Sequence, residues 1–313
     1  MSEFATLALF GDTLVRATPL ILAGLAIAVA FQGGVLNIGA EGQLLIGACT
    51  STAISLNLGS LLGATTIIVA LIVGALAGAA WAAIAAELKN RFHVLEVIST
   101  IMLNFVALYL ISFLVRGPLQ EPTHVYPQTS SIAPYAQLPV ILGGTRLHVG
   151  FVLAVLAGFI AWWMIRNTAA GFRLRVTGAN AQAARIAGII NVERTTRNTF
   201  LVSGALAGLA GAIEVHGVTF ALYENISPGY GYTAIAVALL AGLNPAWVVA
   251  SGILFGALET GASALQRDAG IPATLVWVVE ALVILVVLAT ERYRSRRSDN
   301  VVIPSLAIAR GSS

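Results

Sequence analysis

The segment Gly171-Phe-Arg-Leu-Arg-Val-Thr-Gly178-Ala-Asn180-Ala-Gln-Ala-Ala184-Arg-Ile-Ala-Gly188-Ile is a short polar helix candidate between two long apolar stretches. Asn180 can accept hydrogen bonds from the next backbone N–H groups, and Gly188 can end the helix in the left-handed conformation, which predicts a helical body over 181–187. So short a helix is not stable alone in water. Its small alanine side chains would let another protein approach the backbone closely, so we predict that it docks against a partner.

The sequence on both sides of this segment is far more apolar than that of a soluble domain. The chain has 313 residues, of which 58% are hydrophobic and 10% charged, and its mean hydropathy is +0.89. Nine segments are near or above the ~20 apolar residues that cross a bilayer as a helix. We therefore predict an all-α polytopic membrane protein, a single domain over 1–313, whose short seventh segment could be a half-helix. The expected spans are roughly 14–31, 35–56, 61–86, 97–115, 148–166, 198–222, 231–243, 246–265 and 271–290.

Basic residues predict the orientation, because they collect in cytoplasmic loops. Three regions hold twelve of them: 87–96, the loop 167–197 and the tail 291–313. The opposite loops hold three, Arg116, Arg146 and Arg267. We expect the amino terminus outside and the carboxyl terminus in the cytoplasm. The twelve are Lys89, Arg91, Arg173, Arg175, Arg185, Arg194, Arg197, Arg292, Arg294, Arg296, Arg297 and Arg310.

The predicted extracytoplasmic loop 116–147 contains five of the ten prolines, so it cannot be helical throughout. It is either a solvated connector or a ledge on which a soluble partner docks.

Glycines recur at regular spacings within the expected spans. Pairs four residues apart, at 59/63, 74/78, 204/208 and 252/256, predict close helix packing. The pentapeptide Gly-Ala-Leu-Ala-Gly occurs at 74–78 and 204–208, for which coincidence is the better explanation in so Gly- and Ala-rich a chain. Glycine-rich segments also begin spans two (33–42) and seven (228–232) from opposite sides, as in transporters with inverted repeats.

Polar residues within a membrane span require a reason, since their transfer into hydrocarbon is unfavourable. Asn37 and Glu41 are four residues apart, which would place them on one face of span two with Gln43 nearby. We interpret them as lining a pathway; the alternative is that Glu41 caps a helix end or pairs with an arginine. The further candidates, each as suited to a bond between helices as to a substrate contact, are Asn104, Glu214, His216, Glu259 and Glu280.

Several functions lack their motifs. The four histidines show no metal-ligand spacing, so no metal is predicted. The only lysine, Lys89, follows no glycine-rich phosphate loop, so ATP binding by that motif is excluded. Ser203 and His216 lie ~20 Å apart along one helix and could not form a protease pair. The lone Cys49 is assigned to packing, and the arginines flank spans in a way that does not indicate nucleic-acid binding.

Four blocks in the same order resemble the permeases of bacterial ABC importers of the branched-chain amino acid and ribose group, and most closely the nucleoside type. They are the 171–188 region, Gly34-Val-Leu-Asn-Ile-Gly-Ala-Glu-Gly-Gln43, Glu96-Val-Ile-Ser-Thr-Ile-Met-Leu-Asn104 and Ile235-Ala-Val-Ala-Leu-Leu-Ala-Gly-Leu-Asn-Pro245. The resemblance implies a type II-like importer permease in the bacterial cytoplasmic membrane. It also implies a second, similar permease, two ATP-binding domains that carry ATP and Mg, and an external substrate-binding lipoprotein.

The resemblance further implies that the 171–188 region couples the permease to the ATP-binding domains, while this chain is itself no enzyme. The candidate coupling residues are Arg173, Arg175, Gly178, Asn180, Ala183, Ala184 and Gly188. A nucleoside would suit a path with Asn37, Gln43 and Asn104, although nothing excludes a sugar. The alternative is a secondary transporter in which Glu41, Glu214 or Glu280 carries a coupling proton; an intramembrane enzyme ranks third.

Overall fold

The computed structural model describes residues 3–188, 190–269, 278, 281–282 and 285–286. Residues 1–261 form one compact unit and 262–313 a second. The described chain is helical without named strands, as predicted, and its β pairing consists of two isolated bridges. The helices are α1 (Glu3–Gln32), α2 (Ala40–Leu62), α3 (Thr66–Phe92), α4 (Glu96–Val115), α5 (Gly150–Asn167), α6 (Ala169–Ala179), α7 (Ala181–Ile186), α8 (Val192–Glu214), α9 (Tyr230–Leu240) and α10 (Pro245–Ala269), with short turns of helix at Gly63–Thr65, Pro134–Ala136 and Val215–Thr219.

Six segments of the described chain are long and apolar enough to cross a membrane. One of them, 40–92, comprises α2 and α3, which fold back on each other so that Gly74 lies against Gly47 and Ser51. The first eight expected spans each coincide with a helix. The ninth, 271–290, lies almost wholly outside the described residues, as do Glu280 and the tail 291–313, so the count of nine stays a prediction.

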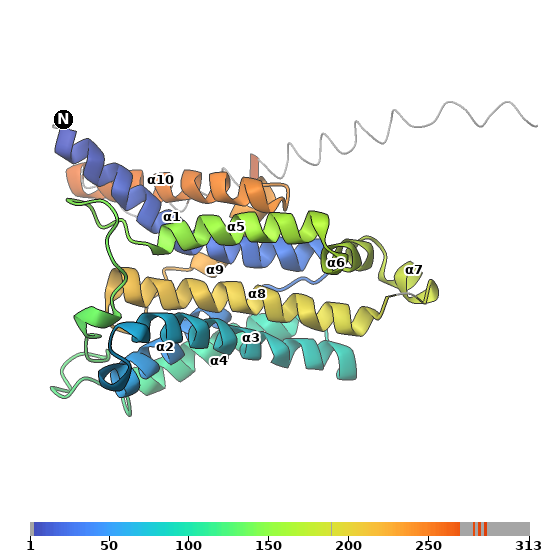
Figure 1. Cartoon of the computed structure of the whole chain (residues 1–313), viewed down its shortest axis with the longest axis horizontal. Coiled ribbons are helices and arrows are strands. Elements are labelled where there is room, and N and C mark those ends of the chain that lie inside the picture. Colours follow the sequence, from blue (N-terminus) through green and yellow to red (C-terminus); the bar gives the residue numbers. More distant parts are fainter. Residues whose placement is uncertain (1–2, 189, 270–277, 279–280, 283–284, 287–313) are drawn as a thin grey trace, which may run out of the picture. The chain divides into compact units, whose positions relative to one another are not determined.

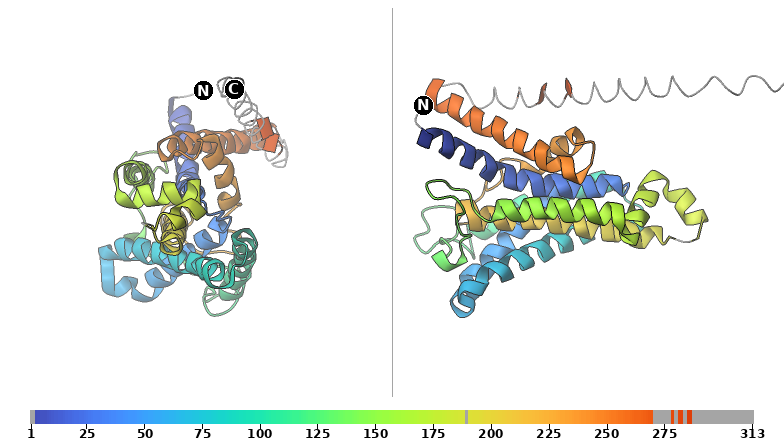
Figure 2. Two further views of the ribbon diagram at one scale, coloured as in Figure 1. Left: turned by 90° about the vertical axis from the view of Figure 1, so that its right-hand side faces the viewer. Right: turned by 45° about the horizontal axis from the view of Figure 1, so that its top comes forward.

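The long helices run side by side between two different ends of the first unit. In Figure 1, α5 and α8 run horizontally across the picture. Helices α6 and α7 project beyond the right-hand end, and the connector 116–149 lies at the left-hand end. The second panel of Figure 2 shows the same two ends after rotation. Below, they are called the α6–α7 end and the connector end.

The two Gly-Ala-Leu-Ala-Gly segments pack against each other. A Cβ added at Gly204 would lie 2.4 Å from the Gly78 carbonyl oxygen, and one at Gly208 would lie 2.4 Å from that of Gly74. Any side chain at these positions would force α3 and α8 apart. Coincidence is therefore not needed to explain the recurrence, because both copies serve the same antiparallel crossing, where close van der Waals contact replaces the hydrophobic effect.

The other glycine pairs differ in their roles. Gly252 and Gly256 pack closely on α1, as expected, with Ile21 and the Thr13 carbonyl as neighbours. The prediction for Gly63 is wrong: a Cβ added there would have nothing within 4 Å, and the residue ends α2 with φ +53°. A helix C-terminus, not a helix crossing, needs glycine there.

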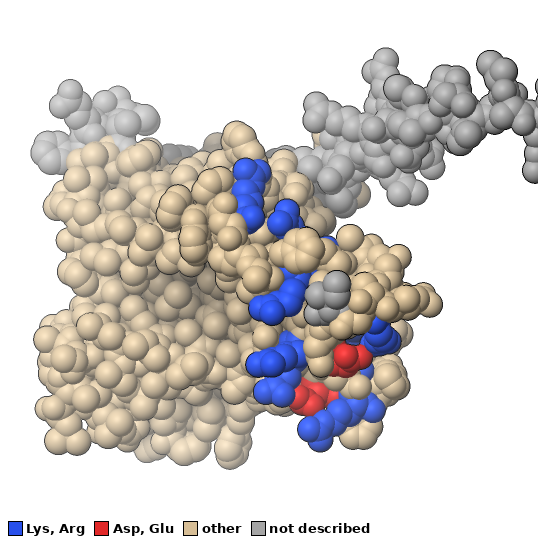
Figure 3. Space-filling view, turned by 45° about the vertical axis from the view of Figure 1, so that its right-hand side comes forward, with Lys and Arg blue, Asp and Glu red and all other residues tan. Residues whose placement is uncertain are grey.

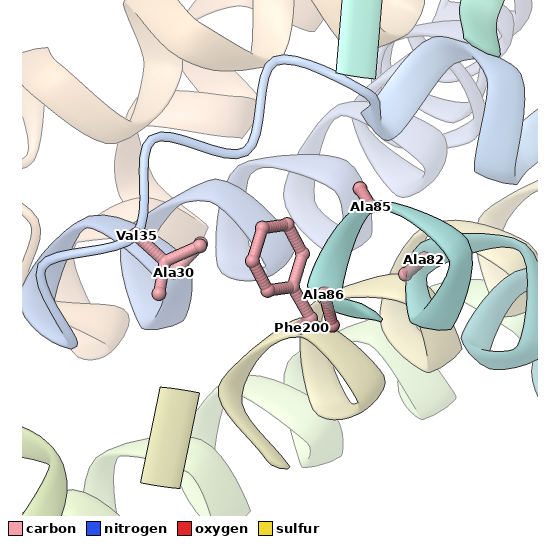
Figure 4. Close-up of a cluster of buried hydrophobic side chains, with 6 residues drawn as sticks. All are labelled: Ala30, Val35, Ala82, Ala85, Ala86 and Phe200. Carbon is pink, nitrogen blue, oxygen red and sulfur yellow. The ribbon is translucent and has the colours of Figure 1, made fainter. Parts of the chain in front are cut away.

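Phe200 holds the centre of a buried cluster near the α6–α7 end. Figure 4 shows its ring between Ala30 and Val35 on one side and the alanines of α3 on the other. Because Ala82, Ala85 and Ala86 are small, α3 leaves room for this one large side chain. The cluster fixes α1, α3 and α8 around the non-helical segment that contains Val35.

Two stretches enter the bundle as non-helical chain. After α1, the chain turns at Gly33 and Gly34 and continues without regular structure through 35–38, so α2 begins only at Ala40. The expectation that Asn37 and Glu41 share a helical face is therefore wrong, because Asn37 precedes the helix. Gly34, at φ +70°, supplies the backbone conformation that interrupts the helix.

The second stretch, 220–229, leads to α9. This helix has 11 residues, which gives it a length of roughly 16 Å, about half the ~30 Å hydrocarbon layer. The seventh segment is thus confirmed as a short helix.

Candidate functional site

The amino-terminal ends of α2 and α9 meet inside the bundle at Glu41. The Gly231 backbone N–H donates to Glu41 Oε2 at 2.7 Å, and the Ser227 hydroxyl also bonds to this carboxylate. A Cβ at Gly231 would lie 2.3 Å from the Glu41 nitrogen, so only glycine permits this approach. Glu41 is 7% exposed. Helix amino termini carry unpaired N–H groups and partial positive charge. The Glu41 carboxylate lies in the first turn of α2 and accepts an N–H group of α9, so its negative charge is close to both helix amino termini.

Asn37 holds the non-helical stretch in place. Its amide nitrogen donates to Gln43 Oε1 at 3.0 Å and to Ser203 Oγ at 2.8 Å. Its carbonyl oxygen accepts from the Gly39 N–H at 2.9 Å and from Gln43 Nε2 at 3.0 Å. All four hydrogen-bonding positions of the amide are therefore used within the protein. Ser203 in turn donates to the Ala26 carbonyl at 2.8 Å, which ties the stretch to α1 and α8.

Asn104 completes the cluster from α4. Its oxygen accepts from the Gly42 N–H at 2.8 Å, and its nitrogen donates to the Ile38 carbonyl at 3.0 Å and to the Tyr232 hydroxyl at 3.3 Å. We call Asn37, Glu41, Gln43, Asn104 and Gly231 the junction. It joins α2, α4 and α9 and satisfies backbone groups that the two helix starts leave open.

Sequence reasoning selected four of these residues and missed how they are joined. Asn37, Gln43 and Asn104 are 0%, 2% and 3% exposed and bond to protein atoms. Gly231 carried a signal, since its glycine-rich segment stands out in the sequence. Ser203 carried none, because a lone serine in an apolar span does not reveal its partner.

Two of the other intramembrane candidates, His216 and Glu259, contact residues outside the junction. His216 bonds to Ser55 Oγ at 2.8 Å and to the Ala212 carbonyl at 2.7 Å, which is a satisfied structural role. Glu259 faces Arg16 at 3.8 Å, and Glu214 is 4% exposed. Ser203 and His216 have separate partners, as expected from their spacing. Among the described residues, no three His, Cys, Asp or Glu side chains gather where they could hold a metal ion.

Helix α6 packs directly beneath the first non-helical stretch. Thr168 caps it by accepting the Gly171 N–H at 3.1 Å. A Cβ at Gly178 would lie 1.9 Å from the Gln32 carbonyl oxygen and 3.0 Å from the Gly34 nitrogen. Gly178, a candidate for contact with a partner, is thus pressed against its own chain. It connects α6 to the segment that leads to Asn37.

The α7 helix forms as the sequence predicts, over Ala181–Ile186. Asn180 Oδ1 accepts the Ala183 N–H at 2.9 Å, and Gly188 has φ +69°. One expectation is wrong: Ala184 is only 2% exposed, so its small side chain serves internal packing and not the approach of a partner. Ala183 is exposed.

Two large apolar side chains at this end were missed by sequence reasoning. Ile186 is 78% exposed and Phe172 is 55% exposed. The signal was present, since each is a large apolar residue in an otherwise polar segment. Arg173 and Arg175 are exposed too, and Figure 3 shows Lys and Arg side chains gathered on this part of the surface, apart from a wide uncharged face.

The connector is fastened to the stretch that leads to α9. The backbone N–H groups of Thr129, Ile132 and Leu138 donate to the carbonyls of Leu222, Phe220 and His216 at 2.9, 2.8 and 2.7 Å. The Arg116 guanidinium bonds to Glu224 at 2.7 Å and, with the Ser112 hydroxyl, holds the pKa of Glu224 below its ordinary value. The connector is therefore an ordered structure on top of this stretch.

Comparison with known proteins assigns the chain to a family. A model of the branched-chain amino acid transport system / permease component family matches residues 9–288. The glucose ABC transporter permease protein TsgB13 of Haloferax volcanii is 37% identical over 91% of this chain and 77% of its own length. For the guanosine ABC transporter permease protein NupP of Bacillus subtilis the values are 38%, 91% and 82%.

A further guanosine ABC transporter permease protein of Bacillus subtilis, NupQ, is 29% identical over 91% of both chains. No solved structure matches. The family is a transport component and not a catalytic subunit, and its apolar helices make it a multi-pass membrane protein. Because the family model matches residues 9–288 and these relatives are similar over most of their length, the chain belongs to the permease component family of branched-chain amino acid transport systems.

Proposed function

We propose that this chain is the translocation subunit of an ATP-driven importer, and that its solute is a neutral, hydroxyl-rich molecule, a nucleoside first and a sugar second. The relatives named for guanosine and glucose support this substrate class over an amino acid. ATP would bind and be hydrolysed in separate subunits.

The observation that carries the proposal is the position of Glu41. Where helices break inside transporters, their amino termini attract anionic substrate groups. Here the carboxylate of Glu41 already accepts from the Gly231 N–H at the start of α9, at 2.7 Å. The carboxylate of an amino acid would have to displace it, whereas the hydroxyl groups of a sugar or ribose would not.

The structure would then represent the closed state of the path, in which the side chains of Asn37, Gln43 and Asn104 are bonded within the protein. The Asn37 and Gln43 amides bond to each other, the Asn104 amide bonds to backbone groups and to the Tyr232 hydroxyl, and the bond to Tyr232, at 3.3 Å, is the longest of these. Separation of α9 from α2 and α4 would break this bond first and free amide groups that can both donate and accept from a nucleoside. The same motion would open the contact between Glu41 and Gly231.

Both ends of the unit are linked to the junction by short non-helical chain. At one end, Gly178 of α6 presses on Gln32 and Gly34, and the chain then runs directly to Asn37. At the other, the connector holds 216–222 by three backbone hydrogen bonds, and the chain then runs to Gly231. An ATP-binding subunit docked on α6 and α7 and a substrate-binding protein docked on the connector would thereby bias the same two-state element.

The basic α6–α7 end would face the cytoplasm, because arginine and lysine are retained there during insertion. A second permease would complete the translocation pathway. The pair of guanosine permeases in Bacillus subtilis supports a heterodimer.

The test is uptake of radiolabelled adenosine, ribose and leucine into proteoliposomes, with and without the ATP-binding subunits and the binding protein. The proposal expects adenosine uptake, at higher rate than ribose, only with ATP and all partners. Leucine uptake would overturn the substrate class. Uptake driven by a proton gradient with this chain alone, and lost in Glu41→Gln, would establish a secondary transporter instead.

A further inference from the structure

A pocket of about 360 Å³ opens at the α6–α7 end between α1, α5, α6 and α8. Its lining is partly apolar, with Val29, Met164 and Val202, and partly polar and basic, with Arg173, Arg194 and Asn198. Arg194, Asn198 and Val202 follow one another at four-residue steps on one face of α8, so the lining changes from basic to apolar along this helix. The junction uses none of this cavity, while α6, on which the ATP-binding subunit is proposed to dock, lines part of it with Ala170, Arg173 and Leu174.

Among the residues that the structure describes, neither arginine of the pocket has an acidic partner. The acidic residues at this end are engaged elsewhere: Glu87 with Arg91 and Arg197, Glu96 with Lys89, and Glu193 with Arg185. Within the part of the chain that the structure describes, Arg173 and Arg194 form no ion pair, and the Asn198 side chain forms no hydrogen bond. The pocket therefore carries two positive charges and free donors, which favours an anion.

The residues beside the pocket are of the kinds that gather at a bilayer surface. In the last turns of α5, the Arg166 guanidinium lies 5.2 Å from the centre of the Trp162 ring, and Trp163 beside it is 51% exposed. Tryptophan gathers where hydrocarbon meets lipid headgroups. Met164, in the same turn, lines the pocket, so we expect its apolar part at the hydrocarbon boundary and its arginines at headgroup depth.

We propose that this pocket binds an anionic phospholipid, with the headgroup phosphate between Arg173 and Arg194 and the start of an acyl chain along Met164 and Val202. A guanidinium offers paired N–H groups that match phosphate oxygens. Basic pockets between helices at the membrane surface are suited to such headgroups. The mixed lining favours a lipid over a free anion, which would use only the basic part.

The test measures lipid retained by the purified full chain, transferred from detergent into nanodiscs of phosphatidylcholine with a minor fraction of phosphatidylglycerol, by native mass spectrometry. We expect phosphatidylglycerol to be retained selectively. Arg194→Gln should weaken its retention about fivefold, since each basic residue near the surface contributes a comparable factor. Arg194→Lys, which keeps the charge but loses the paired N–H groups, should give a retention between those of the wild type and Arg194→Gln. Arg175→Gln is the matched control, because Arg175 is an exposed arginine of the same helix as Arg173 but does not line the pocket.

Three results would overturn the proposal. Equal losses in Arg194→Gln and Arg175→Gln would mean that only general surface charge attracts the lipid. Displacement of the lipid by excess inorganic phosphate would mark a site for a small anion. The ATP-binding subunits could also displace the lipid when they are added and cover Arg194 themselves. That result would mean that the pocket binds an acidic residue of this partner.

Discussion

The junction and α7 are both built around an asparagine, yet the two asparagines work in opposite surroundings. Asn37 is 0% exposed and makes four hydrogen bonds, one of them to a residue 166 positions away. Asn180 is exposed and its side chain caps a helix that begins one residue later. The first organises tertiary structure and the second organises one turn.

The pairing of polar groups in this membrane protein depends on where they lie. Inside the bundle, no water replaces a lost partner, so the junction satisfies itself completely. At the α6–α7 end, charged and apolar side chains remain open, and Ile186 is 78% exposed. A region whose polar groups all bond to one another is suited to a gate. A region whose charged and apolar side chains are exposed is suited to docking.

The largest effect should come from removing the junction asparagine. Asn37→Ala leaves the Gln43 amide and the Gly39 N–H without the partners they have here and removes the bond that Ser203 accepts, and we expect the free energy of unfolding to fall by about 4 kcal/mol. Asn180→Ala loses one cap and should lower it by about 1 kcal/mol. Thermal unfolding in detergent measures both. Equal losses would mean that the two asparagines do not differ as the structure indicates.

The next largest contrast lies within α7 itself. Ala184→Trp forces a large ring into a buried position and should destabilise the fold by up to about 3 kcal/mol. Ala183→Trp, one residue earlier and exposed, should leave the unfolding temperature unchanged but prevent co-purification of the ATP-binding subunits. If Ala183→Trp retains them at wild-type levels, α7 is not the docking element.

The connector adds a test by pH. Burial, with the nearby Arg146 charge, lowers the pKa of His148 to about 4, and this residue lies in the connector, before α5 begins at Gly150. The unfolded imidazole takes up a proton below about pH 6.5 and the folded one does not, so stability is lost as pH falls toward 4. From pH 7 to 5 the loss should be about 2 kcal/mol. Thermal unfolding of His148→Gln should lack this component; an unchanged pH dependence would contradict it.

The smallest effect on stability should come from Ile186→Ser. Because this side chain is exposed, the free energy of unfolding should change by less than about 0.5 kcal/mol. Association with the ATP-binding subunits should nevertheless weaken, measured by co-purification yield. Wild-type association would remove Ile186 from the docking surface.

Local features of the molecule could be predicted well from the sequence. The cap at Asn180 and the left-handed Gly188 act within a few residues, so their pattern is visible in the chain. Hydropathy predicts that the second span begins near 35, whereas α2 begins at Ala40, because apolar residues continue through a stretch that is not helical. Hydropathy reports which residues avoid water, not which backbone they adopt.

The helical class, the apolar segments, the basic end and the family can all be read from the amino-acid sequence, because each depends on composition, on short-range order or on motifs within the chain. The bond between Gly231 and Glu41 and the crossing of the two Gly-Ala-Leu-Ala-Gly segments become visible only in the folded protein. A buried polar group must find a partner, but many residues in a long apolar chain could serve. The choice is made by how the helices pack, which brings residues 190 positions apart within hydrogen-bonding distance.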